Sequence, residues 1–330
     1  MISRRHCRAA FVAAAVVMAA CGKPRVEVNP IVPAMKANRE RTPVGSVLEV
    51  TYTWTAEAGA RKIPANYRAF AHFVEGRTVL FNDDHVPVPP PDQWQPGQTY
   101  TYTRTVFVPV VPVVGPVQLI MGLYPSSGNG DRIALKAEDI GMHAHKVGTL
   151  ELLPQTENIF LVYKEGWHGV ETAPDDPKAE RTWTKKEALV SFKNPKRDVV
   201  VYLEADTNFK AFPQPPVLTV STNGGAGLQI PIDSSDVFLK KIRFKADQLG
   251  TDEWVDLRLA MNQSFVPKTM GLNQDERELG LLVYHLNILE ADALGTPPPA
   301  AVVDAGPLAP AGKAPAPAPA SKARPAVTKS

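Results

Sequence analysis

The chain has 330 residues and a formal net charge of +2 at pH 7. The positive charges of Arg4, Arg5 and Arg8 together exceed this net charge, so the chain that follows them is close to neutral. We therefore do not expect general nucleic-acid binding. After residue 20, no segment approaches the roughly 20 apolar residues that a membrane helix needs. Cys7 and Cys21 are the only cysteines, which excludes a scaffold built on several disulfides.

The first 22 residues have the pattern of a secretory signal. Three arginines precede an apolar run from Ala9 to Ala20, which ends in the residues Met-Ala-Ala-Cys-Gly. The small residues before Cys21 resemble the lipobox of bacterial lipoproteins. This resemblance implies a signal peptide over 1–20, acyl chains such as palmitate on Cys21, and a lipid-anchored protein of the bacterial cell envelope, in the outer membrane. The alternative is an ordinary secretory signal with a cysteine near the cleavage site.

Proline and alanine distinguish two terminal segments from the rest of the chain. Residues 21–43 contain four prolines and little apolar periodicity, which predicts a lipidated tether. Residues 293–330 consist mainly of alanine and proline, so we expect a disordered tail with polyproline character. The tail is net basic and would favour anionic polymers or lipid headgroups, although most such tails are only solvated extensions.

Between these segments, strand patterns follow one another without a convincing amphipathic helix. In 47–54, apolar and polar side chains alternate with the period of a half-buried strand. Further strands are expected in the first domain, 44–154, at 67–74, 100–108, 117–124 and 149–153. Because these short strands are separated by turn residues and not by helices, they predict an antiparallel β-sandwich.

A second block of strand patterns begins near residue 155 and predicts a second sandwich over 155–292. Its strands are expected at 188–192, 199–205, 217–221, 228–232, 237–244, 255–261 and 279–289. Asn223 and Gly224 both tolerate positive φ and predict a tight hairpin. The predicted fold class is therefore all-β, with two tandem antiparallel sandwiches of immunoglobulin-like or jelly-roll-like type.

One polar cluster offers metal-ligand chemistry. His72, Asp83, Asp84 and His85 combine two imidazoles with two carboxylates, as a zinc site would. Asp and Asn also cap turns at strand ends, and this structural role is the favoured interpretation. We therefore expect no metal and no cofactor.

The motifs of common enzyme classes are absent from the sequence. There is no Gly-x-Ser-x-Gly elbow, no His-Glu-x-x-His motif and no phosphate-binding glycine loop. We expect a non-catalytic protein. Glycoside hydrolysis requires only two carboxylates at a set distance, so an envelope glycan hydrolase stays the alternative.

Aromatic side chains are the better functional lead, because sugar rings stack on flat apolar faces with polar edges. The candidates are Trp94 and Tyr124 in the first domain, and Trp167, Trp183 and Trp254 in the second. The competing interpretation is that these rings fill the cores of the sandwiches.

Two sets of motifs resemble known bacterial modules. The motifs AHFVEGRTVLFNDDHVP, WQPGQTY and GLYPSSGNGDR, within 71–132, are similar to a β-sandwich module of envelope proteins and of the soluble ends of membrane glycosyltransferases. The motifs GWHGVE, RTWT and SFVPKTMGLNQDERELGLLV, within 166–283, resemble a sandwich domain associated with glycosyltransferases. The resemblance implies an accessory or binding role near envelope polysaccharide and transfers no catalytic residue.

Asp275 and Arg277 allow a physical prediction of their own. Alternate residues at the mouth of a strand face one side, so a carboxylate and a guanidinium there form a bidentate pair that pins the loop after Pro267. Glu171 and Arg181 are expected to join this pair. The same groups are also candidates for a ligand site.

The sequence thus predicts a lipid-anchored envelope protein that binds or scaffolds, with polysaccharide or an envelope protein as partner. The alternatives are a glycan hydrolase and a structural assembly component. An acidic pair in one cleft favours the hydrolase, exposed aromatic faces favour sugar binding, and an exposed apolar patch favours a protein partner.

The lipid anchor gives the first testable prediction. Replacing Cys21 with serine removes the thiol that accepts the diacylglycerol, so the variant should lose metabolic fatty-acid label and leave the membrane fraction. A Cys7→Ser variant is the matched control and should keep both. Unchanged labelling of the Cys21 variant would contradict the anchor.

Overall fold

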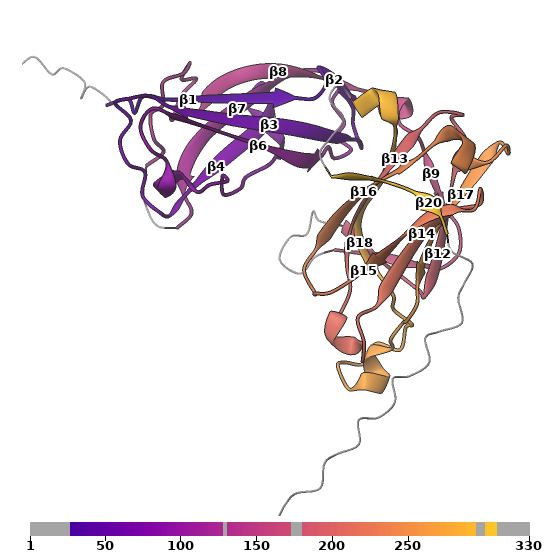
Figure 1. The fold of residues 1–330 in the computed structure, drawn as a ribbon. Coiled ribbons are helices and arrows are strands. Elements are labelled where there is room, and N and C mark those ends of the chain that lie inside the picture. Colours follow the sequence, from indigo (N-terminus) through magenta and orange to yellow (C-terminus); the bar gives the residue numbers. More distant parts are fainter. Residues whose placement is uncertain (1–26, 128–130, 173–179, 295–300, 309–330) are drawn as a thin grey trace, which may run out of the picture.

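The computed structural model describes residues 27–127, 131–172, 180–294 and 301–308. Its strands form two β-sandwiches that meet at an angle, so the chain has the outline of an L (Figure 1). The predicted all-β class and the two antiparallel sandwiches are confirmed. Within the described residues, no helix is long and apolar enough to cross a membrane.

The first sandwich packs a three-stranded sheet against a five-stranded one. The three-stranded sheet has the order β1 (Ile31–Ala37), β3 (Val47–Ala56) and β6 (Gln98–Phe107). The five-stranded sheet has the order β2 (Arg41–Pro43), β8 (His145–Leu153), β7 (Gly115–Pro125), β4 (Tyr67–Glu75) and β5 (Thr78–Asn82). Alternate residues of β3, among them Tyr52 and Trp54, are completely buried between the sheets, whereas threonines on the same strand face outward.

The second sandwich consists of two six-stranded sheets. The first sheet has the order β10 (Trp167–Thr172), β11 (Glu180–Thr184), β18 (Leu282–Glu290), β13 (Val199–Asp206), β16 (Phe238–Phe244) and β19 (Val302–Asp304). The second has the order β20 (Gly306–Pro307), β15 (Ala226–Pro231), β14 (Val217–Thr222), β17 (Trp254–Met261), β12 (Glu187–Lys193) and β9 (Leu161–Tyr163). Aliphatic side chains from both sheets form the core between them.

Two strands lie in the segment expected to be a tether. β1 and β2 fall within 21–43, and β1 pairs with β3 over seven residues. Ile31 and Met35 of β1 are buried in the core, and Pro33 is tolerated because β1 is an edge strand. The expected tether range is therefore wrong from residue 31 onward, because the described prolines of this segment lie in or beside edge strands and not in a loop.

The expected tail also contributes to the second sandwich. β19 pairs in parallel with β16, and β20 pairs with β15. Ala305 between them is 5% exposed, receives a hydrogen bond from Gln248 Nε2 and donates its own N–H to Arg243 O. The predicted start of the tail at residue 293 is wrong for this reason.

The β14–β15 hairpin is confirmed with a different turn. Its loop residue with positive φ is Gly225, at 81°, and not Asn223 or Gly224. Gly224 is required for another reason, because a Cβ there would lie 2.2 Å from the backbone oxygen of Gln248.

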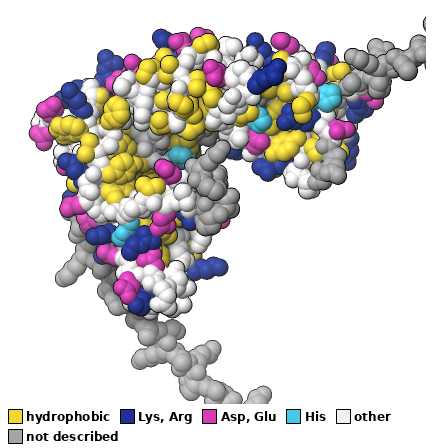
Figure 2. Space-filling model, turned by 180° about the vertical axis from the view of Figure 1, so that it is seen from behind, with side chains coloured by type: hydrophobic (Ala, Val, Ile, Leu, Met, Phe, Trp, Pro, Cys, Tyr) yellow, Lys and Arg dark blue, Asp and Glu magenta, His cyan; other side chains and the backbone are white. Residues whose placement is uncertain are grey.

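The two sandwiches are joined by a packed interface at the corner of the L, which Figure 2 shows from behind. Val47 and Phe107 of the first sandwich pack against Val200, Tyr202 and Leu289 of the second. An ion pair crosses this interface. Its members are Glu49 and Lys241, whose charged atoms lie 2.8 Å apart and whose side chains are 6% and 11% exposed.

Hydrogen bonds and a ring contact complete the interface. Asn158 and Asn287 donate side-chain hydrogen bonds to the backbone oxygens of Val44 and Gly45, at 2.7 and 2.9 Å. The rings of Phe107 and His285 stack at 3.9 Å with an angle of 5° between their planes. The relative position of the two sandwiches is thus fixed by apolar, ionic and hydrogen-bonding contacts together.

The strands at the end of the described chain predict the effect of truncation. Deleting residues 301–330 should lower the free energy of unfolding by about 2 kcal/mol, because it removes hydrogen bonds worth about 0.5–1.5 kcal/mol each and exposes apolar surface that Ala305 covers. Deleting only 309–330 removes none of these contacts and is the control. Urea unfolding followed by circular dichroism measures both variants. Equal stability of the two deletions would contradict the role of β19 and β20.

Candidate functional site

The second sandwich is open between its two edge strands, β9 and β10. A cavity of about 400 Å³ lies there, and we call it the edge cleft. Its lining residues are Tyr163, Trp167, His168, Val170, Glu180, Arg181, Thr182, Val283, Tyr284 and Leu286. The edge cleft exists because β9 and β10 end their respective sheets without a further strand to close the gap.

Two aromatic rings form one wall of the edge cleft. Tyr163 and Trp167 meet edge to face, with ring centroids 4.8 Å apart and planes at 77°. The indole N–H of Trp167 donates to the backbone oxygen of Leu189 at 2.8 Å, which fixes that ring against the core. Tyr163 is 51% exposed, so its ring face is accessible. Val283 and Leu286, both buried, provide an apolar floor.

The polar side of the edge cleft is a hydrogen-bonded group. The Tyr284 hydroxyl donates to a carboxylate oxygen of Asp206 at 2.8 Å, and Arg181 is hydrogen-bonded to Tyr284. Burial raises the pKa of Asp206, and burial with the neighbouring carboxylate raises the pKa of Tyr284 to about 12. The edge cleft thus combines aromatic faces with oriented donors and acceptors, as sites for polar ring-shaped ligands do.

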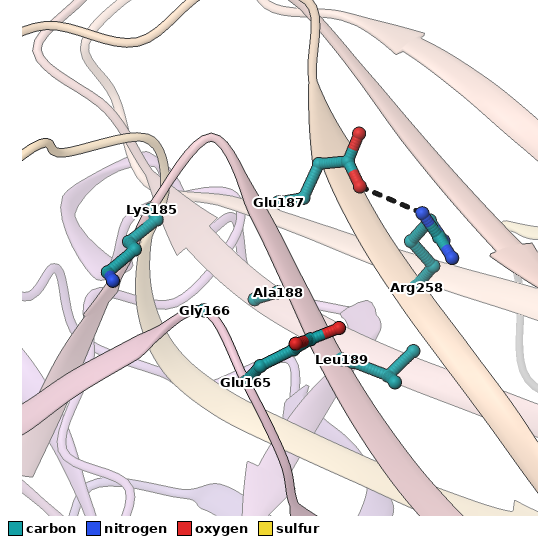
Figure 3. Close-up of a pocket in the computed structure, with 7 residues that line it drawn as sticks. All are labelled: Glu165, Gly166, Lys185, Glu187, Ala188, Leu189 and Arg258. Carbon is teal, nitrogen blue, oxygen red and sulfur yellow. Dashed lines mark hydrogen bonds and ion pairs between the residues drawn. The ribbon is translucent and has the colours of Figure 1, made fainter.

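A second cavity, of about 290 Å³, opens beside the first residues of β12 (Figure 3). Glu165 and Glu187 both line it. Glu187 is bound to Arg258 at 2.8 Å, and the two side chains are 56% and 55% exposed. Lys185 also lines the cavity, and Figure 3 shows its side chain extending away from Glu187. This cavity therefore has two carboxylates in its lining, one of which is paired with an arginine.

Of the predicted ligand-binding residues, Trp167 alone lies in the edge cleft. Trp94 is 5% exposed, stacks on Tyr100 at 5.6 Å and donates its indole N–H to Pro89 O at 2.9 Å. The prediction that Trp94 presents a ligand face is wrong, because its ring completes the core of the first sandwich. Trp183 packs edge-on against Phe265 at 5.8 Å, within a small apolar cluster.

Tyr124 joins part of the predicted metal cluster. His72 Nε2 lies 3.2 Å from a carboxylate oxygen of Asp84, and Tyr124 is hydrogen-bonded to the same carboxyl group. Burial alone would raise the pKa of Asp84, but these hydrogen bonds outweigh that effect and lower the pKa. The group lies beside Phe70, far along the chain from the edge cleft residues.

Asp83 and His85 belong to a different network in the core of the first sandwich. Arg104 binds both carboxylate oxygens of Asp83 at 2.8 Å, and Tyr52 donates to the same carboxylate. His85 donates through Nδ1 to the backbone oxygen of Asp83, and its Nε2 accepts from the Tyr102 hydroxyl, both at 2.7 Å. Burial lowers the pKa of His85, which keeps the ring neutral.

These contacts occupy the atoms that a metal would require. Across the part of the chain that the structure describes, no three His, Cys, Asp or Glu side chains are arranged to hold a metal ion. Cys21, the predicted lipid attachment residue, lies outside the described residues.

The predicted pair of Asp275 and Arg277 is present in bidentate geometry. Arg277 Nε and one terminal nitrogen donate to the two Asp275 oxygens at 3.0 and 2.7 Å. The same terminal nitrogen lies 2.7 Å from a Glu171 oxygen. Glu171 therefore joins the pair as expected, whereas Arg181 does not, because it lies with Tyr284. The backbone oxygen of Asp275 accepts from Lys268 N at 2.8 Å, so the loop is pinned.

Sequence reasoning missed Tyr163, which contributes the accessible ring of the edge cleft. It lies in Leu161–Tyr163, a strand of three residues, and three residues are too few to show alternation. The available signal was the pair of β-favouring residues Val162 and Tyr163 shortly before the Gly-Trp motif at 166.

No protein-family model and no curated protein matches the sequence. Among solved structures, the chain is similar to a family GH115 4-O-methyl-alpha-glucuronidase with specificity for decorated arabinogalactans, at 15% identity and a TM-score of 0.30. That match covers 48% of this chain and 20% of the glucuronidase, so this chain spans about a fifth of its length.

Two further structures share similarity over most of this chain. The N-terminal CBM22-1-CBM22-2 tandem domain from Paenibacillus barcinonensis Xyn10C matches at 9% identity and a TM-score of 0.25, over 78% of this chain and 82% of that one. The M60 catalytic domain with the CBM51-1 and CBM51-2 domains from Clostridium perfringens ZmpB matches at 9% identity and a TM-score of 0.22, over 82% of this chain and 32% of that one. The function proposed below rests on this chain's own residues.

The Arg277 contacts predict a modest effect on stability. Because the Arg277 side chain is 38% exposed, Arg277→Ala should lower the free energy of unfolding by about 1 kcal/mol, near the upper end for exposed ion pairs. Lys268→Ala, which removes a more exposed pair with Glu276, should cost less.

The pH dependence of stability tests the same contacts. Hydrogen bonds from Arg277 lower the pKa of Asp275. The resulting stabilisation is complete above the unfolded-state value of about 3.9 and is lost as the pH falls through the folded value. The difference between parent and Arg277→Ala in urea unfolding should therefore shrink in acid, and a constant difference would contradict the role of Asp275.

Proposed function

We propose that this protein is a non-catalytic carbohydrate-binding protein and that the edge cleft receives the sugar. The observation that carries the proposal is the exposed Tyr163 ring beside Trp167, over an apolar floor and opposite the Arg181, Tyr284 and Asp206 group. Sugar rings have apolar CH faces that stack on aromatics and hydroxyl edges that accept and donate hydrogen bonds. The edge cleft supplies both kinds of contact.

The size of the edge cleft supports a short stretch of glycan. Its volume of about 400 Å³ lies in the lower part of the roughly 300–1,000 Å³ range of small-ligand sites. Because β9 and β10 are both edge strands, the edge cleft opens at the side of the sandwich, and a polymer that binds in it would continue beyond it.

The location proposed for this activity rests on the sequence. A lipid on Cys21 would hold the protein at the bacterial outer membrane, and the module resemblance supports a role near envelope polysaccharides. Each buried CH₂ of an acyl chain contributes about 0.8 kcal/mol, so several chains anchor a protein firmly.

A glycan hydrolase is the second candidate, and one observation favours it. Glu165 and Glu187 line the same cavity (Figure 3). Most glycoside hydrolases use a pair of carboxylates to cleave the glycosidic bond. Release of reducing sugar ends from a bound polysaccharide, lost in Glu187→Gln, would identify the hydrolase and contradict a purely binding role.

Binding through the edge cleft predicts a specific loss of affinity. In native gels containing arabinogalactan, xylan, β-glucan or dextran, at least one polymer should retard the full chain. Tyr163→Ala should weaken that binding by about five- to tenfold, because truncating a contact aromatic commonly costs more than 1 kcal/mol. Tyr163→Phe keeps the ring and should keep most of the affinity.

Met142→Ala is the control, because this residue is 82% exposed and belongs to the first sandwich. All variants should melt within a few degrees of the parent, since Tyr163 is exposed. The proposal fails if none of the four polymers retards the chain, or if Tyr163→Ala binds as the parent does.

A further inference from the structure

The outer face of the sheet that contains β9 carries a second group of exposed apolar side chains. Trp254 on β17 is 46% exposed, Val162 on β9 is 41% exposed, and Phe160, directly before β9, is 54% exposed. Such side chains normally turn inward, and their neighbours Leu161 and Val255 do so. Three exposed apolar groups at β9 and β17, which are separated only by β12, are therefore a surface and not scattered residues.

The strand register places these side chains in two rows. Val162 lies opposite Ser191, which lies opposite Asp256. In the next row, Trp254 lies opposite Lys193, and alternation puts Phe160 on the same face, beyond Lys193. We call this surface the outer platform, with the members Phe160, Val162, Ser191, Lys193, Trp254 and Asp256.

The position of Trp254 is fixed before any ligand binds. Asn194, which is 8% exposed, donates to the backbone oxygens of Gly250 and Asp252, each at 3.1 Å, and its own N–H donates to Glu253 O at 2.8 Å. These bonds tie the loop before β17 to the end of β12. An exposed ring on a rigid support loses little entropy on binding.

The polar members of the outer platform lie between the rings. Ser191 donates to an oxygen of Asp256, so this carboxylate is held in place at the base of the platform. Lys193 is exposed and makes no ion pair among the residues described here. A ligand on this face would therefore meet apolar rings at both sides and, between them, Lys193 and the Asp256 carboxylate, whereas Ser191 is 1% exposed and only positions Asp256.

We propose that the outer platform binds a further stretch of the same polysaccharide chain that enters the edge cleft, so that the ligand is an extended polymer and not a short oligosaccharide. This inference rests on the proposed function. β9 connects the two surfaces, because its Tyr163 points into the edge cleft whereas Val162 points to the outer platform. A chain that leaves the edge cleft over this short edge strand reaches the outer platform directly.

The spacing of the rings suits an extended chain. β9 and β17 are separated only by β12, so side chains on them stand about 10 Å apart, twice the strand spacing of 4.7–4.9 Å. Extended polysaccharides present equivalent faces on every second sugar, and two stacking positions separated by one polar strand match this alternation. A trisaccharide that fills the edge cleft would not extend to the outer platform as well.

The experiment compares polymer and oligosaccharide binding in two variants of the full chain. The probes are the polysaccharide that retards the parent protein and a trisaccharide prepared from it, measured by isothermal titration calorimetry. Trp254→Ala should weaken polymer binding by about five- to tenfold and leave trisaccharide binding unchanged. Tyr163→Ala should weaken both. Val237→Ala, which removes an exposed side chain elsewhere, is the control.

Tryptophan emission gives an independent readout. Because Trp254 is exposed, polymer binding should shift its emission to shorter wavelength, and Trp254→Phe should lose this shift while keeping most of the affinity. Trp254→Ala should melt as the parent does, since the ring is not in a core cluster.

The outcomes separate the two proposals. If Tyr163→Ala loses affinity and Trp254→Ala does not, the outer platform is wrong and the edge cleft stands. If only Trp254→Ala loses affinity, the edge cleft is wrong and the outer platform stands alone. If sedimentation shows that Trp254→Ala converts a dimer to a monomer without changing polymer affinity, the platform is a contact between copies of the chain, and the inference is overturned.

Discussion

The alternation of side chains along β9 is the constraint on which both proposed surfaces depend. Leu161 packs against the core and holds the strand in place, so that Val162 must face outward and Tyr163 must face the edge cleft. Three residue pairs with β12 hold this register, together with the backbone hydrogen bonds that Lys164 and Glu165 make with Leu189. A shift of one residue would exchange the two faces, and both aromatic surfaces would be lost together.

Sequence patterns predicted the strands well where a strand is long, because apolar and polar residues alternate clearly in β3 and a continuous apolar run marks β13, which is buried on both faces. They failed where a strand has few residues, or where proline within or just before a strand indicated a loop instead. β9 has three residues, β1 contains Pro33, and β19 follows a proline run. Chemistry was harder to predict than strands, because the sequence around Trp94 and Trp254 does not show that the first ring is buried and the second exposed; this depends on the tertiary packing.

The junction of the sandwiches shows how a polar contact can determine geometry. Burying Glu49 and Lys241 has a desolvation cost that their attraction only partly offsets, so the pair contributes more to orientation than to stability. Arg39 adds to this pattern. Within the first sandwich it donates to the Ser46 hydroxyl and to Val47 O at 2.8 and 2.6 Å, and across the junction it donates to Ala293 O at 3.3 Å; burial lowers its pKa to about 10. Such groups tolerate only one arrangement of their partners, which holds the L at a single angle.

That fixed angle has a mechanical consequence for a protein held by one end. A flexible connection between the sandwiches would let tension on a bound polymer stretch the linker first, and the second sandwich would move before any load reached the first. With a rigid corner, the second sandwich acts as a lever arm about the first. Force applied at β9 is then transmitted as torque through the Phe107–His285 stack and the Glu49–Lys241 pair to the strands of the first sandwich.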